Sequence, residues 1–347
     1  MSAGPDDLAR GLVESGLLNW AGPGEITLAA SAGGEVMIPE TAKQCVDAAF
    51  STPRPALDLE IVDEDGAGWK AAWFSIEYAR RLAEWRNRGL TLTYRTASAP
   101  GSARLERLAA ARVAVRANLP VDGPSPAKLP FPAARVLAVV GAKAADPDGW
   151  VSLLARERVD GVTWARAEGA AQPAFSRFAA RALARIVDGA ETSDLRDETV
   201  AALMRGRPWE SPGVDVLATL AFGPDGRAFS SEEGMRLAAA GDDLFVLGHA
   251  ATFKFADLPS NPLVPALVSA ALPAAQPLCS SCAYRPYCVI PPSRHYRAQG
   301  SLAGRLPDSP ECASRLSLFG AVFDRISDEK CLKALQKWGV DIARFTC

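Results

Sequence analysis

Histidine is scarce in this sequence, since only His249 and His295 occur among its 347 residues. This scarcity argues against a histidine-rich zinc hydrolase and against most mechanisms that use histidine as a general acid or base. Neither histidine has a recognisable acid or nucleophile as a partner in the sequence. We therefore expect structural or surface roles for both.

The chain also lacks a large net charge and a long apolar run. Its formal net charge is −2, so no global basic field favours nucleic acid or an anionic membrane. The most apolar late stretch, residues 263–275, is too short to span a bilayer and is interrupted by Pro265 and Pro273. Asp6 and Asp7 stand where a secretory signal needs Lys or Arg. We expect a cytoplasmic protein that binds neither nucleic acid nor membranes.

Cysteine is missing from most of the chain, because Cys45 is the only one before residue 279. In the reducing cytoplasm, seven cysteines are weak support for a disulfide framework. Four of them follow as Cys279, Cys282, Cys288 and Cys312, and a C-x2-C-x5-C run more often holds a metal. The sequence thus predicts a metal or iron–sulfur site in its last quarter.

Short apolar runs alternate with segments of helical periodicity through the first half of the chain. The composition, 48% hydrophobic and 22% charged, is that of a globular protein with a sizeable core. Strands are predicted over residues 26–29, 57–62, 90–96, 112–119, 135–141 and 161–164. Helices are predicted to start near Pro39 and at Trp69, and to cover residues 102–110, 148–158 and 174–187. The prolines within residues 121–132 predict an extended connection.

Six strand–helix units of this kind predict a parallel α/β sheet, either open and doubly wound or closed into a partial barrel. Active groups in such folds lie at the carboxyl ends of the strands. Cys45 lies on an apolar helix face, which predicts a core position. The spacing of Trp69, Trp73 and Trp85 favours core packing over a ligand box. Gly89 is the expected C-terminal cap of their helix.

Beyond Gly189 the pattern changes. A helical stretch over residues 194–205 precedes a predicted hairpin, formed by residues 214–222 and 227–230. An apolar run over residues 243–248, the cysteine cluster and a helical segment over residues 316–326 complete the chain. Ser230-Ser-Glu-Glu233 is compatible with an N-capped helix start. Ser31-Ala-Gly-Gly34 is compatible with an anion cradle of backbone N–H groups, although a simple loop is favoured.

The second half also carries several specific motifs: Phe229-Ser-Ser-Glu-Glu-Gly234, Asp242-Asp-Leu-Phe-Val-Leu-Gly248, Cys282-Ala-Tyr-Arg-Pro-Tyr-Cys288, Tyr296-Arg-Ala-Gln-Gly300 and the late Cys312. Together with the strand–helix units, they resemble radical SAM peptide maturases with a SPASM domain, closest to the B-type maturase of the His-Xaa-Ser peptide system. The resemblance implies an N-terminal extension over residues 1–24, a partial (β/α)6 barrel over residues 25–190, and a hairpin and SPASM-like auxiliary-cluster domain over residues 191–347.

The same resemblance identifies two missing elements. A radical SAM enzyme carries three cysteines, C-x3-C-x2-C, just after its first strand, but residues 30–36 contain none. The family's Gly-Gly-Glu turn, which meets the methionine amino group, is replaced by Asp63-Glu-Asp-Gly-Ala-Gly68. We expect that this chain neither binds S-adenosylmethionine nor cleaves it alone, and we assign no catalytic residue.

The resemblance further implies that Cys279, Cys282, Cys288 and Cys312 are the complete ligand set of one auxiliary cluster. A further cysteine of the family is replaced within residues 289–292. Three states of the set stay open: a [4Fe–4S] cluster, which we favour, structural Zn²⁺, and metal-free thiols. The remaining Cys331 and Cys347 are interpreted as a partly buried thiol and a terminal one.

Our leading hypothesis is a degenerate radical SAM/SPASM-like protein of a ribosomal peptide maturation system. It would act as a non-catalytic partner or peptide-binding subunit beside an intact radical SAM paralogue and a precursor peptide. Ser230-Ser-Glu-Glu233 also stands where the family places a short acidic motif. Two alternatives remain: an iron–sulfur oxidoreductase subunit that acts through the auxiliary cluster, and a zinc-stapled α/β scaffold.

Overall fold

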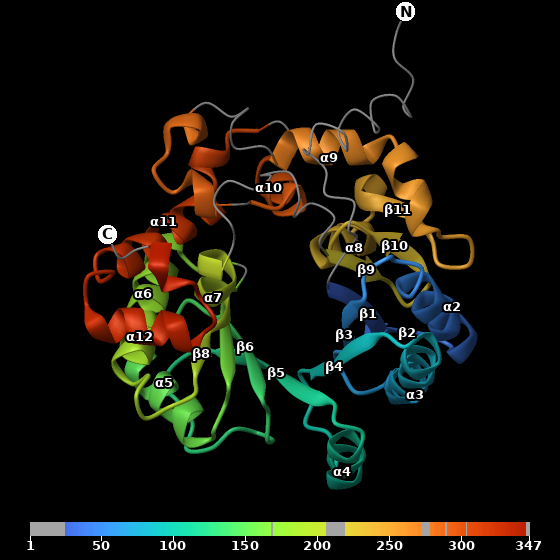
Figure 1. Cartoon of the computed structure of the whole chain (residues 1–347), viewed down its shortest axis with the longest axis horizontal. Helices are drawn as coiled ribbons and strands as arrows, with labels where there is room; N and C mark the ends of the chain where they lie inside the picture. The colour runs from blue at the N-terminus through green and yellow to red at the C-terminus, as the bar shows by residue number, and fades with distance from the viewer. Residues whose placement is uncertain are drawn as a thin grey trace, which may run out of the picture. The chain divides into compact units, whose positions relative to one another are not determined.

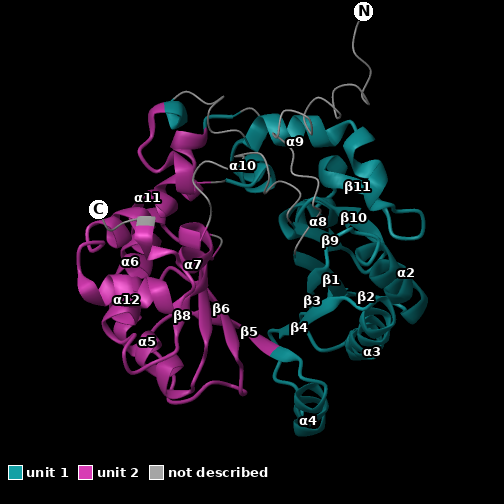
Figure 2. Ribbon diagram, viewed as in Figure 1, with its two compact units in different colours: residues 1–114, 209–280, 289–305 teal, residues 115–208, 281–288, 306–347 magenta. Residues whose placement is uncertain are grey.

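The computed structural model describes residues 25–167, 169–205, 219–271, 278–288, 290–302 and 304–344 (Figure 1). They form two compact units (Figure 2). Unit 1 comprises residues 1–114, 209–280 and 289–305, and unit 2 comprises residues 115–208, 281–288 and 306–347. These units are a different division from the domains predicted over residues 25–190 and 191–347, which stay a prediction. The predicted extension over residues 1–24 lies outside the described residues.

The sheet of unit 1 has the strand order β11-β10-β9-β1-β3-β4. Its parallel strands are β1 (Glu25–Ala32), β3 (Ala56–Asp63), β4 (Gly89–Thr96) and β9 (Thr219–Phe222). The antiparallel strands are β10 (Arg227–Phe229) and β11 (Val246–His249). The first three predicted strands and the predicted hairpin, β9–β10, are confirmed, while residues 214–218 of that hairpin lie outside the described part. Because β9 also pairs with β1, the hairpin extends the sheet.

Helices α2 (Pro39–Ala49), α3 (Trp69–Arg86) and α4 (Ser102–Ala110) lie between or after the strands of unit 1. As predicted, α2 starts with proline and packs Cys45 into the core at 0% exposure. The predicted cap of α3 is wrong. Asn87 adopts the left-handed conformation there, with φ 50°, because asparagine tolerates this backbone. Gly89 is instead the first residue of β4.

The tryptophans of α3 give a mixed result. Trp69 and Trp73 are half-buried, and guanidinium groups from α4 lie over their rings, Arg104 at 5.0 Å and Arg107 at 4.1 Å. Cation–π contacts of this kind hold α4 against α3. Trp85 is 79% exposed, so the prediction of a core position is wrong for this residue. It lies in the last turn of α3, on the solvent side.

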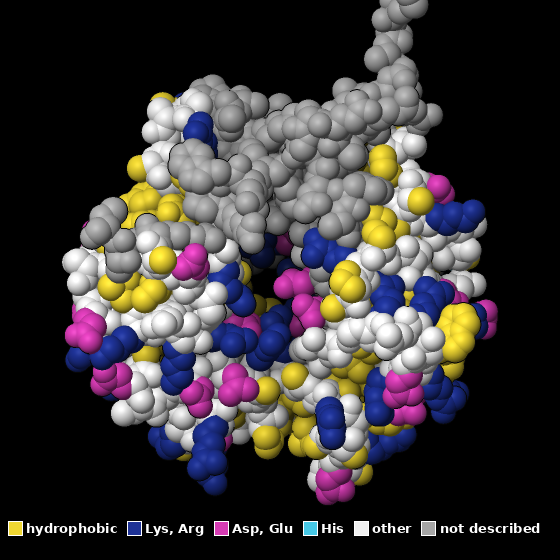
Figure 3. All heavy atoms as spheres, in the orientation of Figure 1, with side chains coloured by type: hydrophobic (Ala, Val, Ile, Leu, Met, Phe, Trp, Pro, Cys, Tyr) yellow, Lys and Arg dark blue, Asp and Glu magenta, His cyan; other side chains and the backbone are white. Residues whose placement is uncertain are grey.

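The remaining helical elements of unit 1 are α8 (Glu232–Ala239), η2 (Asp243–Phe245), η3 (Phe255–Ser260), α9 (Leu263–Ala271) and α10 (Pro292–Gln299). Even α9, the most apolar, is far too short for a bilayer, and among the described residues no helix has the length and apolar character of a membrane span. Basic and acidic side chains are interspersed over the face in Figure 3, in keeping with a net charge of −2.

The sheet of unit 2 is parallel, with the order β5-β6-β7-β8. Its strands are β5 (Ala114–Val121), β6 (Arg135–Val140), β7 (Gly161–Arg166) and β8 (Arg196–Asp197), and its first two helices are α5 (Pro147–Arg156) and α6 (Gln172–Asp188). These confirm the last three predicted strands and two predicted helices. Residues 121–132, all described, contain no helix. The helix predicted from residue 194 starts later, as α7 (Glu198–Arg205), because residues 196–197 pair with β7.

Two helices of the C-terminal tail complete the core of unit 2. α11 (Pro310–Phe323) and α12 (Glu329–Lys337) contribute Leu318 and Leu335 to the same buried cluster as Phe178 of α6. The helix predicted over residues 316–326 is thus confirmed in part, and it begins and ends earlier. Cys331 belongs to this cluster at 1% exposure, whereas Cys347 lies outside the described residues.

Candidate functional site

The segment after the first strand, where the resemblance places the missing cysteines, is a tight hairpin. β1 continues to Ala32, and the chain returns as β2 (Glu35–Val36), which pairs antiparallel with β1. Gly33 and Gly34 form the turn with φ of 59° and 84°. Two consecutive positive φ angles are typical of the two-residue turns that connect hairpin strands. The predicted strand ended at residue 29, whereas β1 continues for three more residues and β2 adds two.

Asp63, the last residue of β3, joins the carboxyl ends of three strands. Its side chain is fully buried. Oδ1 accepts hydrogen bonds from Ser31 Oγ and from the Gly68 N–H, both at 2.8 Å, and Oδ2 accepts one from Tyr94 OH at 2.8 Å. Ser31 Oγ also lies 2.8 Å from Asp65 Oδ1. Because Ser31 belongs to β1 and Tyr94 to β4, one carboxylate links β1, β3 and β4.

Gly68 brings the replacement turn directly onto β1. A Cβ atom at this position would lie 2.5 Å from the carbonyl oxygen of Ala30, so no larger residue fits. Burial and the neighbouring Asp63 raise the pKa of the Tyr94 hydroxyl, which therefore stays a donor. At this end of the strands, side chains and backbone of the protein satisfy one another's hydrogen bonds around Asp63.

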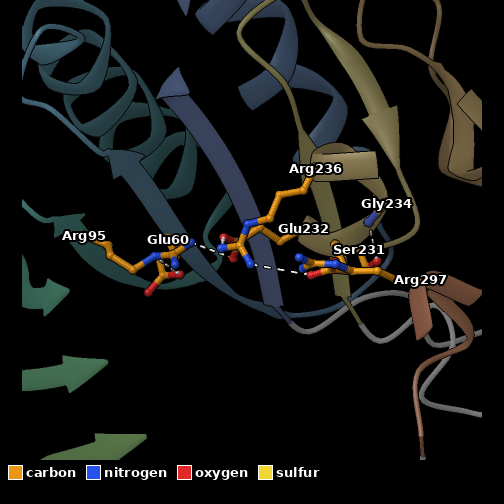
Figure 4. Close-up of polar contacts among 8 residues, drawn as sticks. Glu60, Arg95, Ser231, Glu232, Gly234, Arg236 and Arg297 are labelled. Atoms are coloured by element: carbon orange, nitrogen blue, oxygen red, sulfur yellow. Dashed lines mark hydrogen bonds and ion pairs between the residues drawn. The ribbon is translucent and has the colours of Figure 1, made fainter. Parts of the chain in front are cut away.

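Arg95, the next residue of β4, holds a buried ion-pair cluster (Figure 4). Its side chain is 3% exposed and contacts Glu232 at 2.6 Å and Glu60 at 3.1 Å. Burial disfavours the charged forms of Arg95 and Glu232. The attraction of Glu232 and Glu60 outweighs this burial effect at Arg95 and raises the pKa of its guanidinium. Arg95 and Arg236 likewise outweigh burial at Glu232 and lower the pKa of its carboxyl. Both partners of the central pair are therefore charged.

Glu232 is the first residue of α8, and the start of this helix is fixed by its cap. Ser231 Oγ accepts the N–H of Gly234 at 3.1 Å and lies 2.7 Å from Ser293 Oγ of α10. The N-capped helix start predicted from the sequence is confirmed. Glu233 pairs with Arg297, also from α10, at 2.8 Å. The cap residues thus connect α8 to α10.

Three motifs that define the resemblance meet in this cluster. Gly234 is required because a Cβ there would lie 2.6 Å from the Phe245 Cβ. Phe245 packs edge-on against Tyr296, with ring centroids 5.4 Å apart. A hydrogen bond to Asp242 raises the pKa of the Tyr296 hydroxyl. Residues 229–234, 242–248 and 296–300 therefore form one packed group in unit 1, which their sequence separation does not reveal.

The four predicted metal ligands are all half-buried. Cys279 opens η5 (Cys279–Ser281) and belongs to unit 1, whereas Cys282, Cys288 and Cys312 belong to unit 2. Cys288 follows η6 (Arg285–Tyr287), and Cys312 lies in the first turn of α11. The structure therefore assigns three of the four cysteines to one compact unit.

Aromatic contacts dock the cysteine loop of unit 2 on α11. The ring of Tyr284 stacks on Phe319 with centroids 5.2 Å apart, and Tyr287 contacts Phe323 at 5.4 Å. Pairs at such distances contribute about 0.5–1.5 kcal/mol beyond their burial. The motif residues between Cys282 and Cys288 hence attach their loop to the helix that carries the late Cys312.

Across the described ranges, no three side chains of His, Cys, Asp or Glu form a ready-made metal site. The cysteine set stays a prediction, and its donor chemistry suits a metal or cluster. Arg315 lies one turn after Cys312. Its buried Nε and Nη1 atoms have no hydrogen-bond partner among the residues that the structure describes, although Glu311 lies 3.6 Å from Nε. A buried, incompletely paired cation in this helix suits the negative charge of a four-thiolate site.

Both histidines occupy structural positions. His249 Nε2 lies 3.0 Å from the carbonyl oxygen of Asp225, and its Nδ1 accepts the N–H of Ala251. His295 in α10 is 1% exposed, and burial lowers its pKa. The sequence reasoning missed Arg95, although a charged residue inside an apolar strand is a visible signal of a buried ion pair.

No family model and no curated protein matches this sequence. Among solved structures, the chain is similar to native anSMEcpe with bound AdoMet, with a TM-score of 0.65, 10% identity, and coverage of 90% of this chain and 99% of that one. It is also similar to native anSMEcpe with bound AdoMet and Cp18Cys peptide, with a TM-score of 0.63, 11% identity, and coverage of 90% and 99%. anSMEcpe is a radical SAM/SPASM maturase. The predicted fold class is confirmed: a parallel α/β sheet like a radical SAM partial barrel, with a cysteine-containing C-terminal region.

Proposed function

We propose that this chain is a degenerate radical SAM/SPASM-like protein that serves as a non-catalytic partner or peptide-binding subunit of an active radical SAM maturase. The peptide system would be a ribosomal one of the His-Xaa-Ser type, as the motifs in residues 229–312 suggest. One observation carries the proposal: the carboxyl ends of β1, β3 and β4 are closed by the Gly33-Gly34 turn and the buried Asp63.

The short segment after β1 supports our expectation that this chain lacks the cluster that activates S-adenosylmethionine. A C-x3-C-x2-C triplet spans about eight positions by its own spacing, while only residues 32–35 lie between the paired Ser31 and Val36. The turn that replaces the Gly-Gly-Glu element packs against Ala30 through Gly68. A fold like that of a maturase, with a two-residue turn directly after β1, supports binding rather than radical chemistry.

Binding to S-adenosylmethionine provides the first test. Isothermal titration of the purified chain should give no heat of binding, and incubation with a reductant should give no 5′-deoxyadenosine. An intact radical SAM maturase, assayed in parallel, supplies the positive control. Saturable binding, or cleavage by this chain alone, would refute the non-catalytic assignment.

The tail supports a second element of the proposal, one auxiliary cluster held by Cys279, Cys282, Cys288 and Cys312. When bound, a [4Fe–4S] cluster supplies electron transfer or a structural tie, whereas Zn²⁺ would supply only the tie. The described side chains are not preassembled around a metal. Because metal binding and local folding are coupled, we expect the metal to draw the ligands together.

Metal analysis separates the alternatives. Anaerobically purified protein should contain about four irons and four sulfides per chain, and Cys282→Ala should lose them. Cys45→Ala, which removes a thiol outside the set, should retain them. Zinc alone would favour the zinc-stapled scaffold and exclude electron transfer, while a metal-free protein would refute the site.

The partner assignment requires its own experiment. A pull-down with the neighbouring maturase that carries an intact cysteine triplet, and with its precursor peptide, should recover at least one of them. Failure of the wild-type chain to bind either molecule would refute the proposal.

A further inference from the structure

Three arginines share one row across the sheet of unit 2. The strand register pairs Arg116 with Arg135, Arg135 with Gly161, and Gly161 with Arg196. Residues in register point to the same face of a sheet. The next residue of β5, Ala117, is buried in the hydrophobic core. The arginines therefore lie on the face opposite the core.

Glu198 from the start of α7 fills the gap that glycine leaves in this row. Its Oε2 lies 2.9 Å from Arg116, and its Oε1 lies 3.3 Å from Arg135 and 3.9 Å from Arg196. A Cβ at Gly161 would lie 2.7 Å from Glu198 Oε1, so the glycine makes room for the carboxylate. One carboxylate thus serves three guanidinium groups.

Arg135 and Arg196 keep most of their donor capacity. A guanidinium has five N–H donors. Within the described part of the chain, Arg135 uses only Nε toward Glu198, and the 3.9 Å separation of Arg196 from Glu198 exceeds a hydrogen bond. Their side chains are 32% and 33% exposed, so solvent reaches both. Two partly exposed guanidinium groups on one sheet face suit a ligand with two carboxylates.

A second observation favours a peptide as that ligand. Asn118 belongs to the next residue row on the same face, in register with Leu137. Its side-chain oxygen is buried and has no hydrogen-bond partner among the described residues. A ligand reaches this atom only when the amide rotates toward the arginine row, where a peptide N–H would satisfy the acceptor and a phosphate offers no such donor. Leu137 beside it is half-buried and gives apolar contact.

We propose that Arg135 and Arg196 bind an acidic peptide segment in polyproline II conformation. The two residues are two strand spacings apart, which is about 10 Å. Polyproline II has three residues per turn and rises about 3.1 Å per residue, so two acidic side chains three positions apart point to the same side, about 9 Å apart, and match the pair. The inference rests on the proposed function only for the identity of the peptide, a precursor. The chemistry of the row does not depend on it.

The test uses fluorescence anisotropy with the full chain and two labelled peptides. The first carries glutamates three positions apart, and the second carries glutamine at both positions. Wild-type protein should bind the acidic peptide at least tenfold more tightly, and this preference should weaken as salt increases. Equal affinity for both peptides would overturn the inference, whatever the pull-down with the maturase shows.

Variants then locate the binding. Arg135→Gln combined with Arg196→Gln leaves the Arg116–Glu198 pair intact and should weaken acidic peptide binding at least tenfold. Arg181→Gln, on the exposed surface of α6 in the same unit, is the matched control and should bind like wild type. A double variant that binds like Arg181→Gln refutes the site. Circular dichroism checks that each variant is folded. A single-stranded oligonucleotide of equal charge is tested in the same assay, and tighter binding of the oligonucleotide than of the acidic peptide would overturn the peptide assignment.

Discussion

Asp197 offers a quantitative test of the packing in unit 2. This last residue of β8 is 0% exposed, and its Oδ1 accepts the N–H of Val200 at 3.0 Å. Its Oδ2 has no hydrogen-bond partner in the described part of the chain. Burial is the main cause that raises the pKa of this carboxyl from 3.8 to about 7, and the N–H groups of Val200 and Thr199 offset it in part.

The sign of the pH effect follows from proton binding. Between pH 4 and pH 7 the folded chain holds a proton on Asp197 that the unfolded chain has lost, so the free energy of unfolding falls as pH rises through this window. The slope is at most about 1.4 kcal/mol per pH unit, which gives about 4 kcal/mol in total. Asp197→Asn has the same shape and keeps the helix cap, because asparagine caps as well as aspartate, but does not titrate.

We therefore expect wild type and Asp197→Asn to have similar stability at pH 4.5, and the variant to be more stable by up to about 4 kcal/mol at pH 8. Urea unfolding at several pH values, followed by tryptophan fluorescence, measures the difference. Asp194→Asn is the control. The exposed carboxylate of Asp194 pairs with Lys337, and this pairing lowers the pKa of Asp194. Any change in the free energy of unfolding with pH that comes from Asp194 therefore has the opposite sign. A difference between wild type and Asp197→Asn that is constant from pH 4.5 to 8 would refute the reasoning.

Three further changes test the candidate regions. Arg95→Met should cost about 3 kcal/mol in urea unfolding, because it removes the buried guanidinium that lies between the half-buried Glu60 and Glu232. Gly34→Val, at a φ of 84°, should lower the melting temperature by an amount that corresponds to about 1–2 kcal/mol. Tyr284→Ala removes the stack on Phe319, which fixes the cysteine loop. We expect this variant to bind less metal, while the melting temperature of unit 2 changes little. Unchanged stability would contradict the expectation for Arg95→Met or Gly34→Val, and unchanged metal content would contradict the expectation for Tyr284→Ala.

The sequence predicted the strands well because their apolar runs are buried on one or both faces. In β6, for example, Val136, Ala138 and Val140 are buried and their neighbours are half-buried, which is the alternation that the pattern predicts. Helix ends were harder. Asn87 replaced Gly89 as the cap of α3, since both residues tolerate the left-handed conformation and only the backbone decides between them.

The candidate regions depended on contacts that no local pattern reveals. The pairing of β9 with β1 joins residues far apart in the sequence. The extension of β1 through Ser31 depends on β2 and on Asp63, not on the propensity of the segment. The arginine row depends on strand register, because Arg116 and Arg135 look like ordinary charged positions at two strand starts.

The two regions of interest lie at opposite ends of their strands. In parallel α/β folds, ligands bind at the carboxyl ends, and residues at the amino ends mostly serve stability. Here the carboxyl ends in unit 1 are closed by Asp63, which uses both oxygens internally. Arg135 and Arg196 are the first residues of their strands. If the arginine row only stabilised the sheet, we would expect an acidic partner for each arginine, but among the described residues Glu198 alone faces all three. Incomplete pairing at this end therefore favours a binding role over a purely structural one.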